Sequence, residues 1–261
     1  MQEAIRSSSV GSTVSYRTRA LDSAEWVGYF QRNDHRLAII PWELGAELSD
    51  EERNAIAKSV QAFQLGESSE GRHLQHCADQ WGMLNRDAHY PLAIQLFIKE
   101  EQRHARELGR FLETNGVGLI RKDWSDSLFR KIRHLASLEL SIMVLLTAEI
   151  VAQVYYVALR ESTNSIVLKT ICNQILKDEE EHVRFQCERL AIIGRPQNWI
   201  RLTLRYCVQR ALMLGALPIV WHGHHKAYKT DGFNFGRFAS ETWLAFSRAV
   251  PRMHPNSYET A

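Results

Sequence analysis

Two short motifs in this sequence pair a glutamate with a histidine three residues later, Glu101 with His104 and Glu179 with His182. On an α-helix this spacing puts both side chains on one face, about one turn apart, so each pair can reach a common metal ion. One such pair is a weak signal, because a protein with many charged helices contains it by chance. Two pairs indicate a metal site if the neighbouring helices supply further acids at the same level.

Glu149 is the acid expected opposite Glu179. If their helices are antiparallel and joined near Asn164, residues at one level are equidistant from that turn, which places the partner of Glu179 near position 149. Glu149 is also the only acid between Leu140 and Arg160. A charge buried in so apolar a segment is costly unless it is paired or bound to a metal, so Glu149 is predicted to be a ligand.

The matching acid in the first hairpin is Glu67 or Glu70. With a turn near Asn85, the partner of Glu101 is expected near position 69, which these two glutamates bracket. Four carboxylates and two histidines are the donor set of dimetal carboxylate bundles, and four negative charges neutralise two divalent ions. The predicted metal ligands are Glu67, Glu101, His104, Glu149, Glu179 and His182, with Glu70 as an alternative or additional ligand from the first helix.

Two further acids, Glu100 and Asp178, directly precede the motif glutamates. Each could accept the outer ring N–H of the histidine on the opposite helix and so fix its tautomer, with exposure to solvent as the alternative. For the acids as a group, the alternative interpretation is a set of ordinary salt bridges on solvated faces, with the cations Lys99, Arg103, Arg106 and Arg184. Glu149 has no obvious partner of this kind.

Four long helices are expected to carry these residues. Ser49 and Glu52 form a capping box at the start of the first helix, and Pro91 suits the first position of the second. The helices are predicted over residues 49–81, 91–114, 135–161 and 166–193. Short turns join the first to the second and the third to the fourth, whereas a long connection separates the second from the third. This pattern predicts an all-α fold, a ferritin-like four-helix bundle with one long crossover.

The predicted organisation of the chain has four parts. A leader rich in serine and arginine, expected to be flexible, precedes an extension packed on the bundle, and a C-terminal extension of one or two helices follows the bundle. The predicted boundaries are 1–20 for the leader, 21–48 for the N-terminal extension, 49–194 for the dimetal bundle and 195–261 for the C-terminal extension.

Composition argues against several classes of protein. The chain has 261 residues, a formal net charge of +2 and no long run of one sign, so a nucleic-acid-binding surface is not indicated. The four cysteines are scattered without a CxxC pair and are predicted to be reduced, buried thiols. The N-terminus lacks an apolar stretch of signal-peptide type, and the run Ala211–Trp221 is too short to span a bilayer. We therefore expect a cytoplasmic protein without a membrane span.

Three segments resemble the ferritin-like di-iron carboxylate superfamily, and locally most of all rubrerythrin-type proteins: AFQLGESSEGRHL, EEQRHARELGRFLE and DEEEHVRF. The resemblance covers roughly residues 50–193 and lies in the order Glu, ExxH, Glu, ExxH. It implies a di-iron centre. The implied ligands are Glu67 from the first helix, Glu149 from the third, Glu101 and Glu179 as bridging or terminal carboxylates, and His104 and His182 capping the two metals.

The chain also departs from these proteins, because it lacks the four-cysteine rubredoxin site of rubrerythrins and extends beyond a bare ferritin bundle. The expected function is an oxidoreductase in which two iron ions, or manganese or a mixed pair, activate dioxygen or peroxide. The expected partners are that oxidant, an organic substrate to be oxidised or hydroxylated, an external electron donor and a second copy in a homodimer. Iron storage without an organic substrate and a structural metal site are the alternatives.

Two other features of the sequence each allow two interpretations. The cluster His222, His224 and His225 could bind a metal, but a polar helix end or an interface is the favoured interpretation. Tyr155 and Tyr156 follow Glu149 by two helical turns, and core packing is favoured over a redox role.

Overall fold

The computed structural model describes residues 19–68, 71–121, 137–228 and 233–259, and in this part of the chain every regular element is a helix. The protein therefore belongs to the all-α class, as predicted. The long helices are α1 (Ser23–Asp34), α2 (Asp50–Glu67), α3 (Arg72–Asn85), α4 (His89–Thr114), α6 (Leu138–Glu161), α7 (Ile166–Gly194), α8 (Trp199–His224) and α9 (Phe235–Ala249). Short 3-10 helices lie at Trp42–Leu44, Val250–Met253 and Pro255–Ser257.

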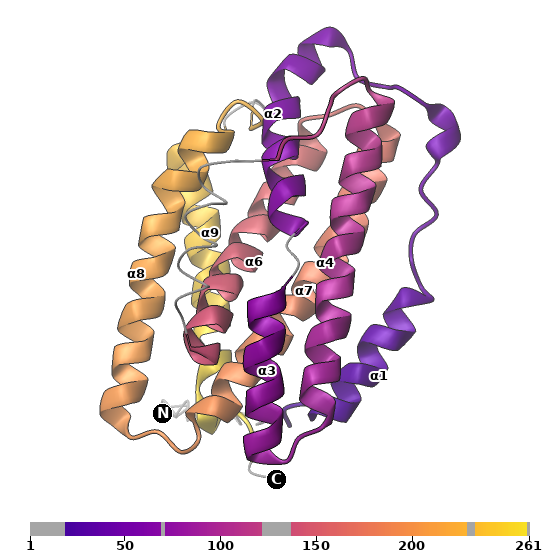
Figure 1. Cartoon of the computed structure of the whole chain (residues 1–261). Coiled ribbons are helices and arrows are strands. Elements are labelled where there is room, and N and C mark those ends of the chain that lie inside the picture. The colour runs from indigo at the N-terminus through magenta and orange to yellow at the C-terminus, as the bar shows by residue number, and fades with distance from the viewer. Residues whose placement is uncertain (1–18, 69–70, 122–136, 229–232, 260–261) are drawn as a thin grey trace, which may run out of the picture.

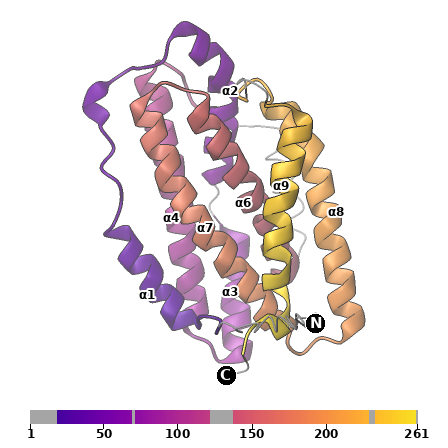
Figure 2. The same cartoon turned by 180° about the vertical axis from the view of Figure 1, so that it is seen from behind.

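The centre of the molecule is a bundle in which α4, α6 and α7 lie side by side (Figure 1). Its fourth position is filled by α2 and α3, which follow one another along α4. Helix α1 packs against α4 on one flank, and α8 and α9 cover α6 on the other, as the view from behind also shows (Figure 2). The segments before and after the bundle are thus packed against its helices.

The prediction of one continuous helix over residues 49–81 is wrong. The helix breaks after Glu67, and a second helix starts at Arg72 and runs to Asn85. Gly71 lies between them with φ +62°, in the left-handed region that an α-helix cannot contain. A Cβ at this position would lie 2.5 Å from Cδ1 of Ile98 on α4, so a side chain here would require Ile98 to shift.

The other predicted helix ends agree closely with the structure. Ser49 and Glu52 form the expected capping box, and α6 and α7 end at Glu161 and Gly194. Helix α4 begins two residues earlier than expected, so that Pro91 is its third residue rather than its first. The C-terminal extension contains two helices, α8 and α9, on either side of the predicted break.

Helix α6 forms the centre of the core. It is the one described helix long and apolar enough to cross a membrane, but 83% of its apolar window is buried by the rest of the fold, as in the core helix of a water-soluble protein. All four cysteines are free. Cys172 and Cys187 are buried as predicted, whereas the expectation of burial is wrong for Cys207, which is exposed, and only partly met by Cys77.

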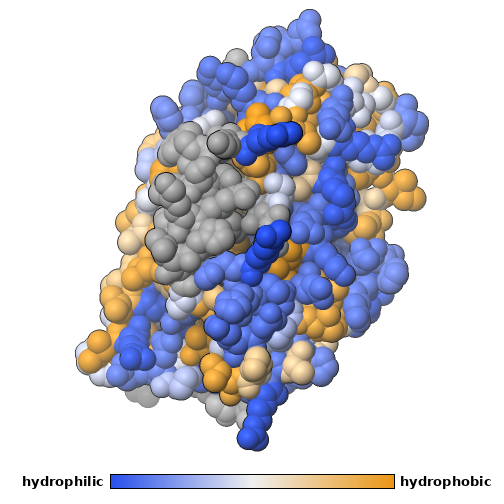
Figure 3. Space-filling model, viewed as in Figure 1, coloured by the Kyte–Doolittle hydropathy of each residue, from blue (hydrophilic) through white to orange (hydrophobic). Residues whose placement is uncertain are grey.

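Helix α8 exposes an apolar surface. Trp199, Ile200, Leu204 and Leu214 of α8 are exposed, and Figure 3 shows hydrophobic residues along the side of the molecule on which α8 lies. The homodimer stays a prediction.

Candidate metal centre

Four helices bring glutamate and histidine side chains together in the bundle core. They form two groups, each with ligand atoms within 4.8 Å of one another, and each group could hold a metal ion. One group consists of Glu67, Glu101, His104 and Glu179, and the other of Glu101, Glu149, Glu179 and His182. The two shared glutamates make the groups adjacent halves of one cluster.

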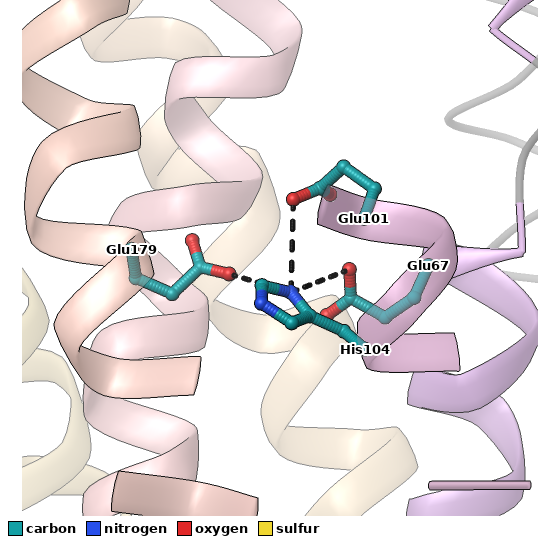
Figure 4. Close-up of side chains that lie close together, drawn as sticks. All are labelled: Glu67, Glu101, His104 and Glu179. Atoms are coloured by element: carbon teal, nitrogen blue, oxygen red, sulfur yellow. Dashed lines mark ion pairs between the residues drawn. The ribbon is translucent and has the colours of Figure 1, made fainter. Parts of the chain in front are cut away.

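The first half is arranged around Nδ1 of His104. This atom lies 3.9 Å from Oε2 of Glu67, 3.8 Å from Oε1 of Glu101 and 3.7 Å from Oε1 of Glu179. Figure 4 shows the three carboxylates converging on the ring from α2, α4 and α7. The spacing leaves room at the centre for an ion rather than for direct hydrogen bonds.

The second half is arranged in the same way around Nδ1 of His182. This atom lies 3.1 Å from Oε1 of Glu101, 3.8 Å from Oε2 of Glu149 and 3.7 Å from Oε2 of Glu179. Glu179 therefore turns one oxygen toward each histidine, which is the orientation of a carboxylate able to bridge two ions.

The donor atoms of the cluster fit a metal because they are buried and lack other partners. His104, Glu179 and His182 are fully buried, and Glu149 is 4% exposed. Within the described residues, no hydrogen bond reaches Nδ1 of either histidine, either carboxylate oxygen of Glu179 or Oε1 of Glu101. Buried polar atoms are nearly always paired, and leaving them unpaired is costly. A cation bound by these atoms would remove that cost.

The electrostatics of the metal-free cluster also indicate that the cluster suits a bound cation. Burial, together with the negative charges of Glu149 and Glu67, raises the pKa of Glu101 to about 8. Burial and the charge of Glu149 raise the pKa of Glu179 well above its usual range. So many carboxylates cannot all ionise without positive charge among them. Divalent ions would supply that charge and lower these pKa values.

The acidic neighbours of the two histidines favour the protonated form of each ring. Burial alone would lower the pKa of His104, but the hydrogen bond of its ring with Asp178 and the nearby carboxylate of Glu67 outweigh burial and raise the pKa to about 9. For His182, Glu100 and Glu101 likewise outweigh burial and raise the pKa well above its usual range. Because metal ligation needs the neutral imidazole, binding a metal here must release protons.

Each histidine binds an outer acid on the opposite helix, as the sequence suggested. Nε2 of His104 lies 3.1 Å from Oδ2 of Asp178, and Nε2 of His182 lies 2.9 Å from Oε2 of Glu100. Both acids are buried, so the alternative of exposed acids is wrong. A ring held at Nε2 presents Nδ1 to the cluster, which fixes the orientation that a ligand needs.

Surface salt bridges do not account for the cluster. Among the described residues, no lysine or arginine pairs with Glu67, Glu101, Glu149 or Glu179; Arg103 binds Asp178 at 2.6 Å instead, and Arg184 binds Glu188 at 3.0 Å. Glu70 lies outside the described residues, so the structure places Glu67 in the cluster without testing Glu70.

Three contacts to the cluster were not predicted. Tyr156 donates a hydrogen bond to Oε1 of Glu67 over 2.8 Å, and Gln186 donates one to Oε1 of Glu149 over 2.9 Å. Gln186 follows His182 by four residues on α7, so helical spacing alone could have identified it. The third is Asn33 of α1, which contacts both outer acids, and no local sequence signal indicates where α1 docks.

A cavity of about 150 Å³ adjoins the cluster. Its polar wall includes Glu67, Glu101 and Glu149, and most of the rest is aliphatic or aromatic, from α2, α6 and α8. His224 also lines it, with Nδ1 2.8 Å from Oγ of Ser59, whereas His222 and His225 are exposed. His222 and His224 of α8 and the C-cap residue His225 therefore do not converge on one point.

Comparisons with known proteins do not assign the chain to a family. No protein-family model matches the chain, and neither a curated protein nor a solved structure matches it. The site is defined by its own residues, a buried set of glutamates and histidines that could hold a metal ion.

Proposed function

We propose that this protein is a ferritin-like dimetal carboxylate oxidoreductase that uses two iron ions to activate dioxygen or peroxide and to oxidise a small organic substrate. When bound, the iron pair supplies the electrons and the Lewis acidity of the reaction. The protein supplies the donor atoms, the dry surroundings and a place for the substrate.

The division of the cluster into two halves supports a dimetal site. Glu67 and His104 would hold one ion, Glu149 and His182 the other, and Glu101 and Glu179 are within reach of both. The four carboxylates carry a total charge that two divalent ions balance. Two antiparallel helix pairs with a long connection between them support the ferritin-like topology. The split of the first helix into α2 and α3 is a departure from the predicted bundle.

The cavity is the observation that favours an oxidoreductase over an iron-storage protein. A space of about 150 Å³ with a mostly apolar wall is the size that holds a molecule such as benzene in an engineered cavity of another protein. Because Glu67, Glu101 and Glu149 form part of its wall, a substrate there would meet the metal ligands directly. Apolar residues such as Val144 and Val151 would exclude water from the reacting groups.

Metal content is the first test of this proposal. Elemental analysis of protein purified without chelators is expected to give about two iron or manganese ions per chain, the number that the two halves of the donor set can hold. The double substitution Glu101→Ala/Glu179→Ala is expected to lose both ions. Glu180→Ala, at an exposed acid beside Glu179, is the matched control and is expected to retain them.

Substrate oxidation is the second test. The reduced, iron-loaded protein is mixed with dioxygen or hydrogen peroxide in the presence of small aromatic compounds, and products are followed by mass spectrometry. Ala152→Leu fills the cavity without changing a ligand, so it is expected to abolish product formation while retaining the metal. Failure of the reduced protein to react with either oxidant would overturn the proposal. Uptake of many irons per chain, unaffected by Ala152→Leu, would favour storage.

A further inference from the structure

The two histidines of the cluster are joined through a residue that lies outside the bundle. Asn33, at the end of α1, is 4% exposed. Its side-chain Nδ2 donates one hydrogen bond to Oε1 of Glu100 over 2.7 Å and another to Oδ1 of Asp178 over 2.8 Å. Each acid uses its second oxygen for a histidine. The result is one unbroken chain, His104–Asp178–Asn33–Glu100–His182.

Each polar atom of the Asn33 amide has a suitable hydrogen-bond partner. A primary amide has two N–H donors, and the two acids supply two acceptors. The amide oxygen accepts from Nζ of Lys177 over 3.2 Å. If the amide were turned over, its oxygen would face two carboxylates and its NH₂ an ammonium group, so the surroundings fix the orientation.

Helix α1 is held firmly enough to act as a support for this contact. Nε1 of Trp26 donates to Oε2 of Glu188 over 2.9 Å, and Arg189 donates to Oγ of Ser23 over 3.0 Å. A capping box of Asp22 and Glu25 closes the N-terminal end of α1. The far end of the helix is thereby fixed on α7, and Asn33 is presented at the other end.

We infer that Asn33 is a positioning residue that couples the two halves of the proposed metal centre by holding both outer acids with one amide. This inference rests on the metal site of the proposed function. Without the amide, Glu100 keeps one donor among the described residues, His182. Asp178 keeps His104, Arg103 and Gln174. Loss of Asn33 therefore weakens the support of both histidines, and that of His182 more.

Zinc(II) is a suitable probe, because carboxylate and imidazole ligands bind it and because it is diamagnetic and redox-inactive. Asn33→Ala is expected to weaken zinc binding by up to about tenfold, because loss of an outer partner of a ligand costs about 10–100-fold and Asn33 supports two such partners without contacting a ligand. Proton NMR of the zinc-loaded protein is expected to show both Nε2–H signals displaced, that of His182 farther. Asp178→Asn and Glu100→Gln assign the two signals.

Val27→Ala is the matched control, because Val27 is a buried packing residue on the same helix and contacts neither acid by hydrogen bond. It is expected to lower thermal stability while leaving zinc affinity and both signals unchanged. Lys177→Met, at an exposed position, removes the charge that orients the amide and is expected to act like Asn33→Ala but more weakly. It keeps the test valid if Asn33→Ala does not fold.

The outcomes separate this inference from the proposed function. Wild-type protein that binds two zinc ions, with variants at positions 33 and 177 that bind as tightly and keep both signals in place, would overturn the coupling role alone. Displacement of only one signal would overturn the coupling between halves. Wild-type protein that binds no metal would overturn the metal centre itself and this inference with it.

Discussion

The phenolic oxygen of Tyr156 lies 2.8 Å from Oε1 of Glu67 and donates a hydrogen bond to it. Both side chains are buried, and Glu67 turns its other oxygen toward His104. Tyr155, the next residue, accepts a hydrogen bond from Ser59 and makes no such contact with the cluster. The two adjacent tyrosines of α6 thus differ in a way that can be tested with one matched pair of substitutions.

Tyr156→Phe is expected to weaken the binding of one of the two metal ions about fivefold, because one hydrogen bond that orients Glu67 is worth about 1 kcal/mol. The fold has no need of this hydroxyl for packing. Metal titration by calorimetry measures the effect, and Tyr155→Phe is the control that retains both affinities. Equal affinities in the two variants would show that Tyr156 does not orient the ligand.

Glu179→Gln is expected to abolish metal binding with little effect on the stability of the metal-free protein at pH 7. Burial and the charge of Glu149 raise the pKa of Glu179 well above its usual range and so favour the neutral carboxyl, and glutamine has nearly the same shape. If the protein binds two metal ions as proposed, both would need the ionised carboxylate of Glu179. Urea unfolding of the two metal-free proteins, with elemental analysis beside it, measures both effects. A large loss of stability in the metal-free variant would contradict the assignment of a neutral Glu179.

The stability of the metal-free protein is expected to fall as pH rises from about 5 to about 9. The folded-state pKa of Glu101 is raised from 4.5 to about 8, and that of His104 from 6.5 to about 9. A group with a raised folded-state pKa stabilises the fold below its unfolded pKa, and this contribution is lost as pH rises through the folded pKa. Metal affinity changes in the opposite direction, because the ion displaces these protons.

Thermal melting at several pH values, with and without metal, checks this pair of trends. The difference in melting temperature between the loaded and the metal-free protein is expected to widen toward pH 9. Glu101→Gln cannot lose a proton, so it is expected to flatten the pH dependence of the metal-free protein. A difference that narrows with rising pH would contradict proton release on binding.

The sequence was informative where function depends on spacing along a helix. Glu149 and Glu179 could be matched because two antiparallel helices joined by a short turn keep equidistant residues at one level, and the structure brings both into one cluster. The partners of the two histidines, Glu100 and Asp178, could be proposed because each directly precedes a motif glutamate and so lies on the helix opposite one of the histidines. Both predictions depend on where residues lie along their helices.

The sequence was uninformative where a long-range contact decides the structure. Asn33 reaches the outer acids because α1 docks on α4 and α7, and nothing within residues 23–34 specifies that position. The break between α2 and α3 was missed for a related reason. Isolated glycines are tolerated in helices, and the sequence does not show that Gly71, rather than Gly66, takes the left-handed conformation beside Ile98 of α4.

Alanine substitutions at these two glycines are expected to change the free energy of unfolding in opposite directions. Gly71→Ala is expected to lower the free energy of unfolding by at least about 1–2 kcal/mol, because alanine is strained at φ +62° and its Cβ would meet Ile98. Gly66→Ala, at an exposed position within α2 where an added Cβ meets nothing within 4 Å, is expected to raise that free energy by up to about 1 kcal/mol, since alanine favours the helix more than glycine does. Urea unfolding of the two variants measures both changes. If Gly71→Ala were instead neutral, a continuous helix from α2 into α3 would be accessible at little cost, and Glu67 would no longer be held at the end of α2 by the break.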